Sequence, residues 1–240
     1  MYNKINELVI TVYLKQDISI KDSYEKIATL INYSMNQSNK LSILHTQGNE
    51  MKHYSLSGLY PIEKDMIYKA DESYNFLIRS YKKEIINEFK HCLDNLSNEV
   101  FDVIMVNKKE YDKSNVEYVD TLTPTMITIK EQKTCWTHNN HSKEYFVQAL
   151  FNNLCRKYNT LQGIRQDFNI LDVIENVEIK SPSAIVTNYK NIKFLGYKIR
   201  VYFKDNNIAQ EFANLAIAEG VGEKNSSFGQ GFTKPYFRRE

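Results

Sequence analysis

The order in which strand and helix patterns follow one another constrains the fold of this chain most. Residues 7–14 form a β-branched run typical of a strand, and residues 22–35 carry apolar side chains at helical spacing, with Ser23 or Asp22 as cap. Two strand-like pieces, a second helical pattern and a buried strand follow in residues 51–60, 66–80, 81–96 and 100–106. The order strand–helix–strand–strand–helix–strand predicts a ferredoxin-like, RRM-like α+β domain.

The same order follows again after a charged, turn-like segment, residues 107–115. The two helices expected there are residues 143–158 and 208–216. The expected strands are residues 123–129, 173–179, 184–189, 192–204 and 232–237. The repetition predicts two tandem ferredoxin-like domains. We place them at residues 1–112 and 116–240, which gives two domains of ordinary size.

A glycine-rich loop joins the last helix to the last strand. Four of the eight glycines of the chain fall within twelve positions, at Gly220, Gly222, Gly229 and Gly231. Such clustering indicates positive φ angles or a backbone that approaches a ligand closely, and bare N–H groups beside a lysine suit phosphate. The loop follows a helix and lacks GxxxxGK[ST], which argues against dinucleotide and Walker A sites. A helix cap and a turn would explain Gly220 or Gly222 but leave the other glycines without a reason.

Composition limits the partners and the compartment. The 31 cationic and 29 acidic side chains leave a net charge of only +2, so an anionic partner needs a local basic patch. Three cysteines without a CxxC pair favour a reducing compartment. Residues 1–16 do not resemble a signal peptide, and no apolar run approaches the roughly 20 residues of a membrane span. We therefore expect a cytoplasmic protein without membrane contact.

Two stretches resemble a known family. Gly220-Val221-Gly222-Glu223-Lys224-Asn225 followed by Phe228-Gly229-Gln230-Gly231-Phe232 looks like the signature loop of CRISPR-associated repeat-processing endoribonucleases of the RAMP superfamily. The segment from Lys52 to Leu59, seven residues after His45, is similar to a second family segment, although His53 stands where many relatives carry proline. The resemblance implies an endonuclease that cuts CRISPR repeat RNA to mature crRNA for antiviral defence. It uses no metal or other cofactor, because the 2′-hydroxyl attacks the adjacent phosphate and leaves a 2′,3′-cyclic phosphate and a 5′-hydroxyl.

The resemblance also assigns catalytic roles. His45 would transfer protons, Lys52 would stabilise charge on the phosphate, and Tyr33 would orient the nucleophile. A solvated histidine, a surface lysine and a core tyrosine are the alternative interpretations. His53 is an alternative catalyst, but in a strand it would point away from the face that carries Lys52.

For the loop, the resemblance implies RNA binding by Gly220, Gly222, Gly229, Gly231, Lys224, Asn225 and Ser226. The expected partners are CRISPR repeat RNA and other CRISPR effector subunits, with the chain acting as a monomer or a homodimer. The alternative function is a repeat-RNA-binding effector subunit that does not cut.

Two further clusters stay open from the sequence. Cys135, His138 and His141 have a spacing that a metal could use, but structural zinc normally needs a fourth ligand, and we expect no metal site. The basic cluster at the end of the third helix is either a solvated face or a phosphate contact; it consists of Arg156, Lys157 and Arg165.

Overall fold

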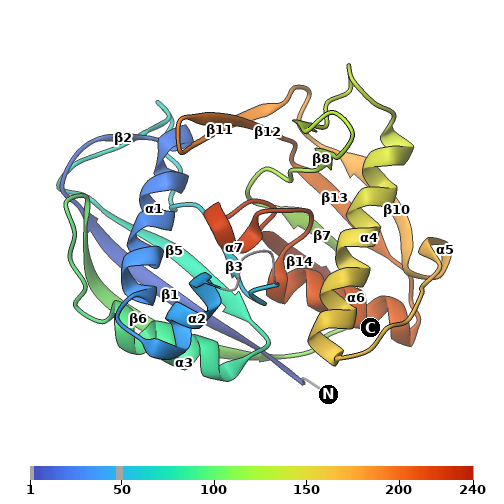
Figure 1. Ribbon diagram of the computed structural model, residues 1–240, viewed down its shortest axis with the longest axis horizontal. Coiled ribbons are helices and arrows are strands. Elements are labelled where there is room, and N and C mark those ends of the chain that lie inside the picture. Colours follow the sequence, from blue (N-terminus) through green and yellow to red (C-terminus); the bar gives the residue numbers. More distant parts are fainter. Residues whose placement is uncertain (1–2, 47–50, 240) are drawn as a thin grey trace.

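The computed structural model describes residues 3–46 and 51–239. It contains two four-stranded antiparallel sheets, one from each half of the chain, and the long helices pack on them (Figure 1). Within the described residues, no helix is both long and apolar enough to cross a membrane.

The first half follows the predicted order. Its main elements are β1 (Lys4–Leu14), α1 (Ile20–Met35), β3 (Ser55–Leu56), β5 (Ser73–Ser80), α3 (Lys83–Leu93) and β6 (Phe101–Asp112). The sheet order β3-β5-β1-β6, with all neighbours antiparallel, is that of a ferredoxin-like domain. Three short elements are added to it, β2 (Ile18–Ser19), α2 (Asn39–Thr46) and β4 (Ile67–Tyr68).

The second half repeats this arrangement. Its main elements are β7 (Val116–Thr121), α4 (Lys143–Gln162), β10 (Ile174–Ile179), β13 (Ile199–Phe203), α6 (Asn207–Glu219) and β14 (Thr233–Phe237). The sheet order β10-β13-β7-β14 is again ferredoxin-like, so the predicted fold class is confirmed. The added elements are β8 (Thr128–Ile129), β9 (Thr134–Cys135), α5 (Ile170–Val173), β11 (Ile185–Tyr189), β12 (Ile192–Gly196) and α7 (Asn225–Phe228).

Local sequence patterns explain the sheet faces and the start of α1. From Leu8 to Leu14, alternate side chains of β1 are fully buried in the core of the first half, while those between them are partly exposed. The cap of α1 is Ser19, whose hydroxyl accepts a hydrogen bond from the backbone N–H of Asp22. Asp22 and Ser23, the predicted caps, lie inside the helix, because the chain enters α1 directly from β2.

The strand boundaries in the middle of the chain differ from the prediction. Most of the segment 107–115, predicted as a turn, belongs to β6, which pairs with β1 as far as Asp112 opposite Lys4. Because β6 is an edge strand, its charged side chains reach solvent without disturbing the sheet. The first strand of the second half is therefore β7, and the prediction of a strand over 123–129 was wrong except for the short β8.

The long strand predicted over 192–204 is also divided in two. Tyr197 leaves the line of β12 and β13 and exchanges backbone hydrogen bonds with Thr125 at 2.7 and 3.0 Å. A Cβ atom at the preceding Gly196 would lie 2.8 Å from the Thr125 carbonyl oxygen. The close approach of these two segments separates the two strands.

The two halves meet around the segment that joins α6 to β14. Phe228 of α7 packs with Tyr24 and Ala28 of α1, and Tyr189 of β11 stacks on Phe228 with 4.5 Å between ring centroids. Figure 1 shows α7 between α1 and the second sheet, beside β3. Both halves therefore contribute to the surroundings of the glycine-rich loop.

Candidate functional site

The four glycines of the loop have structural reasons to be glycine. Each has a positive φ, from +63° to +72°, a backbone region that disfavours side chains. A Cβ atom at Gly231 would lie 1.9 Å from the Val221 carbonyl oxygen, and one at Gly229 would lie 3.1 Å from the Leu56 carbonyl oxygen. Contact with the protein's own backbone thus accounts for the glycines that a cap and a turn had left without a reason.

Hydrogen bonds close this loop on itself. The Val221 N–H donates to the Gly231 carbonyl at 2.9 Å, and the Gly231 N–H donates to Pro124 at 2.8 Å. The buried Asn225 amide donates to the carbonyls of Val221 at 3.0 Å and Gln230 at 2.6 Å. The beginning and the end of the loop are therefore joined through Asn225.

Lys157 of α4 lies beneath the loop with its side chain buried. Its ammonium donates to Asn225 Oδ1 at 2.7 Å and to three backbone carbonyls at 2.8 to 3.3 Å, those of Gly220, Glu219 and Gly222. Burial lowers the pKa of Lys157 to about 7, and nearby Arg156 acts in the same direction. The negative charges of Glu219 and Glu223 oppose that shift.

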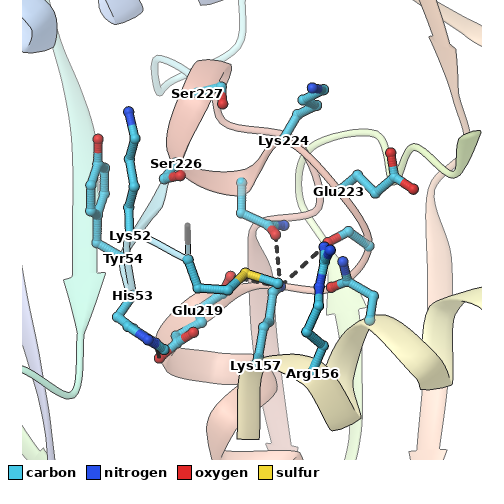
Figure 2. A pocket seen from close by; sticks show the side chains of 14 residues that line it. Lys52, His53, Tyr54, Arg156, Lys157, Glu219, Glu223, Lys224, Ser226 and Ser227 are labelled. Atoms are coloured by element: carbon cyan, nitrogen blue, oxygen red, sulfur yellow. Dashed lines mark hydrogen bonds and ion pairs between the residues drawn. The ribbon is translucent and has the colours of Figure 1, made fainter. Parts of the chain in front are cut away.

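A buried pair links this region to the first half. His53 Nδ1 lies 2.9 Å from Glu219 Oε1, and both side chains are almost fully buried. His53 has a φ of +53° and precedes β3, so the alternation of a strand does not hold between it and Lys52. Both residues line the same pocket, but Figure 2 shows their side chains running in different directions, Lys52 away from Glu219 and His53 toward it.

The pocket lies where the two halves meet at the loop, and Figure 2 shows it from close by. Its volume of about 340 Å³ is within the range of small-ligand sites. Met51 to Tyr54 line one side, Asn153, Arg156 and Lys157 come from α4, and the end of α6 and the loop complete it. The lining residues from that last part are Glu219, Gly222, Glu223, Lys224, Asn225, Ser226 and Ser227.

The polar groups of the pocket favour an anion. Within the described part of the chain, no hydrogen bond or ion pair engages the cationic groups of Lys52, Arg156 and Lys224. Both carboxylates in the lining are engaged: Glu219 by His53, and Glu223 by Thr128 at 2.6 Å. Partial burial lowers the pKa of Lys52. The unpaired cations make this pocket suited to a phosphate group.

The predicted catalytic residues are only partly brought together. Lys52 lines the pocket, whereas Tyr33 lies on α1 with half of its side chain exposed and is not among the described lining residues. His45, predicted in a loop, belongs to the last turn of α2, and its side chain lies outside the described residues.

The predicted RNA-binding residues divide into two groups. Gly222, Lys224, Asn225 and Ser226 line the pocket. Gly220, Gly229 and Gly231 are buried in the packing of the loop and are not among the described lining residues.

The structure also places the members of the basic cluster and of the Cys-His-His cluster in different surroundings. Of the basic cluster, Lys157 is buried while Arg156 is exposed at the pocket. Among the described residues, no group of three His, Cys, Asp or Glu side chains could hold a metal. His138 packs edge-on against the Trp136 ring with 5.0 Å between centroids, and Cys135 Sγ accepts from the Leu195 N–H at 3.4 Å.

Sequence reasoning did not find the role of Lys157 or Glu219. A signal for both was present, because each occupies a position in the apolar stripe of its helix. Lys157 follows Leu150 and Leu154 of α4 at helical spacing, and Glu219 follows Leu215 of α6. A charged residue in such a stripe indicates a buried, partnered ion.

Comparisons with known proteins were made for sequence and structure. The family described as "CRISPR associated protein Cas6, C-terminal" matches residues 105–234, more than half of the chain. No curated protein matches this sequence. A solved structure described as "CRISPR associated protein Cas6" has a TM-score of 0.70 and 19% identity, over 97% of this chain and 99% of that chain.

Two other solved structures are similar over almost their whole length. A Cas6-related protein from Pyrococcus furiosus has a TM-score of 0.69 and 18% identity, over 97% of this chain and 99% of that chain. A RAMP protein described as binding different RNA substrates has a TM-score of 0.72 and 14% identity, over 96% of this chain and 99% of that chain. At such identities, the likeness shows a shared fold.

Proposed function

The chain belongs to the Cas6 C-terminal family, and from that premise we propose that it is a metal-independent endoribonuclease that cuts CRISPR repeat RNA into mature crRNA. The observation that carries the proposal is the pocket beside the glycine-rich loop. Lys52 from the first half and Arg156 and Lys224 from the second half line it together, which suits one phosphate of an RNA strand lying across the junction.

The reaction needs two proton transfers and stabilisation of charge. A base takes the proton of the 2′-hydroxyl, whose oxygen then attacks the adjacent phosphorus. The bond from phosphorus to the 5′-oxygen breaks, and an acid protonates that leaving oxygen. The products are a 2′,3′-cyclic phosphate and a 5′-hydroxyl, and no water or metal ion enters the balance.

We assign the charge stabilisation to Lys52, with Arg156 beside it. A cation close to the non-bridging oxygens stabilises the negative charge that grows on the phosphorane. The half-buried position of Lys52 supports this role, since a charge acts more strongly where water is partly excluded.

We assign proton transfer to His45, with Tyr33 orienting the nucleophile. Met51 of the pocket lies six positions after His45 in the chain, so the distance between their Cα atoms is at most about 20 Å. His53 is the alternative acid or base because it also lines the pocket, but its Nδ1 is engaged by Glu219.

The test is cleavage of repeat RNA from the source genome in EDTA, with chemical analysis of the new 3′ end. One cut that leaves a cyclic phosphate supports the proposal. His45→Ala should slow cleavage by about 10²–10⁴-fold, the usual worth of a positioned acid or base, with little loss of binding. An equal loss of binding would contradict the role of His45.

The second candidate function is repeat-RNA binding without cleavage. The position of Tyr33 away from the described lining of the pocket favours it. Tight binding with no cut by the wild-type protein would select this function, and neither binding nor cutting would reject both.

A further inference from the structure

Side chains from other elements bond the last carbonyls of α6; Ser55 Oγ, for example, donates to that of Ala218 at 3.0 Å. The last carbonyls of a helix have no partner inside the helix. Gly220 turns the chain sharply away at φ +72° and ψ 177°, and the next N–H, that of Val221, donates across the loop to Gly231. The carbonyls of Glu219 and Gly220 instead receive the ammonium of Lys157, at 3.2 and 2.8 Å.

The oxygens around Lys157 Nζ favour its charged form and offset part of the burial that lowers its pKa to about 7. An ammonium has three N–H groups, one more than a neutral amine has. Four oxygens lie within 3.3 Å of Lys157 Nζ, three of them backbone carbonyls and the fourth Asn225 Oδ1. A positive charge at the carboxyl end of a helix is also favoured by the helix dipole.

The contact with Asn225 extends the influence of Lys157 through the loop. Because Asn225 Oδ1 accepts from Lys157 at 2.7 Å, its Nδ2 faces the carbonyls of Val221 and Gln230. One buried donor thus fixes the amide that joins both ends of the loop. Lys224 and Ser226 are the neighbours of Asn225 in the chain, and both line the pocket.

We propose that Lys157 is a positioning residue that holds the glycine-rich loop in the form that presents Lys224 and Ser226 to the RNA. The residue does not touch the substrate in this role; it acts through the loop carbonyls and Asn225. The RNA part of the inference rests on the proposed function, whereas the effect on the loop does not.

The first experiment measures the loop without RNA. Hydrogen exchange of residues 220–231 is compared in the wild type, Lys157→Met and Lys157→Arg, with Lys143→Met as a control at an exposed position of the same helix. Lys157→Met should speed exchange in the loop by about tenfold or more, the effect expected when a charged hydrogen-bond donor is removed. In Lys157→Met, the amides of strand β1 should keep their protection from exchange. Lys157→Arg should restore part of the protection of the loop amides, and Lys143→Met should exchange like the wild type.

If Lys157→Met folds and its loop exchanges at the same rate as the loop of the wild type, the proposal is overturned. If Lys157→Met does not fold, Asn225→Ala provides the second variant, since it interrupts the same connection at the next residue. Faster exchange in the loop of that variant supports the proposal, and unchanged exchange overturns it.

The second experiment is a double-mutant cycle on repeat-RNA affinity. Lys224→Ala should weaken binding in the wild type but have little further effect in Lys157→Met, because the loop no longer presents Lys224. A residue that only stabilised the fold would leave the two effects additive, and additivity overturns the proposal. If the wild type binds no repeat RNA, the proposed function fails, and the exchange experiment alone decides the role of Lys157.

Discussion

Gly231→Ala should destabilise this protein through the loop packing rather than through RNA contact. The added methyl carbon would lie 1.9 Å from the Val221 carbonyl oxygen, whereas a carbon–oxygen contact normally needs about 3.3 Å. Because the obstacle is backbone, the loop itself must move by more than about 1 Å to accept this methyl group.

The cost has two parts. A positive φ, here +63°, disfavours alanine by about 1–2 kcal/mol. Movement of the loop also disrupts the bond from the Val221 N–H to Gly231 and the bond from Asn225 to Val221, each worth about 1 kcal/mol. The total of about 3–4 kcal/mol should lower Tm by about 10 °C in a chain of this size.

Gly163→Ala is the matched control. Gly163 ends α4 with a φ of +66°, and nothing lies within 4 Å of the position a Cβ would take. It should carry only the backbone cost, about 1–2 kcal/mol, and lower Tm by about 4 °C. Urea unfolding of both variants measures the difference. Equal destabilisation of the two would refute the packing argument, and full stability of Gly231→Ala with loss of RNA affinity would favour direct RNA contact.

Three other perturbations test the site. Arg156→Ala should weaken repeat-RNA binding and reduce the log–log salt slope by about 0.7, the value for one lost phosphate contact; binding across a salt series measures it, and an unchanged slope would exclude the contact. His53→Ala should lower the free energy of unfolding by about 1–3 kcal/mol, because the Glu219 carboxylate stays buried without this partner; a fully stable variant would show that the pair is dispensable. Burial lowers the pKa of Lys157 to about 7. Between pH 7 and about 10, the lysine therefore holds its proton more tightly in the unfolded chain than in the folded one. Raising the pH in this range should increase the free energy of unfolding of the wild type by up to about 1.4 kcal/mol per pH unit. Lys157→Met should lack that contribution, and identical pH dependence in the two proteins would contradict the shift.

Much of the fold was predictable because strand and helix patterns are local. The errors fall where tertiary position outweighed pattern. Charged residues near Asp112 extend β6 because an edge strand tolerates them, and this moved the next strand to β7.

The site was predictable only in part. The glycine-rich loop and Lys52 could be selected from short motifs, and both contribute to the pocket. The role of Arg156 stayed undecided between a solvated face and a phosphate contact, because a helix pattern does not show what faces the helix.

What the sequence determined by itself is the order and type of the elements, because apolar periodicity depends on neighbours a few residues apart. Only the tertiary structure decided which side chains meet at the loop. Lys157 and Asn225 lie 68 positions apart in the sequence, and His53 and Glu219 lie 166 positions apart. Such contacts depend on how two separately patterned halves pack against each other, and no local pattern specifies that packing. The same packing decides that a lysine in an apolar stripe is held by carbonyls rather than released to solvent.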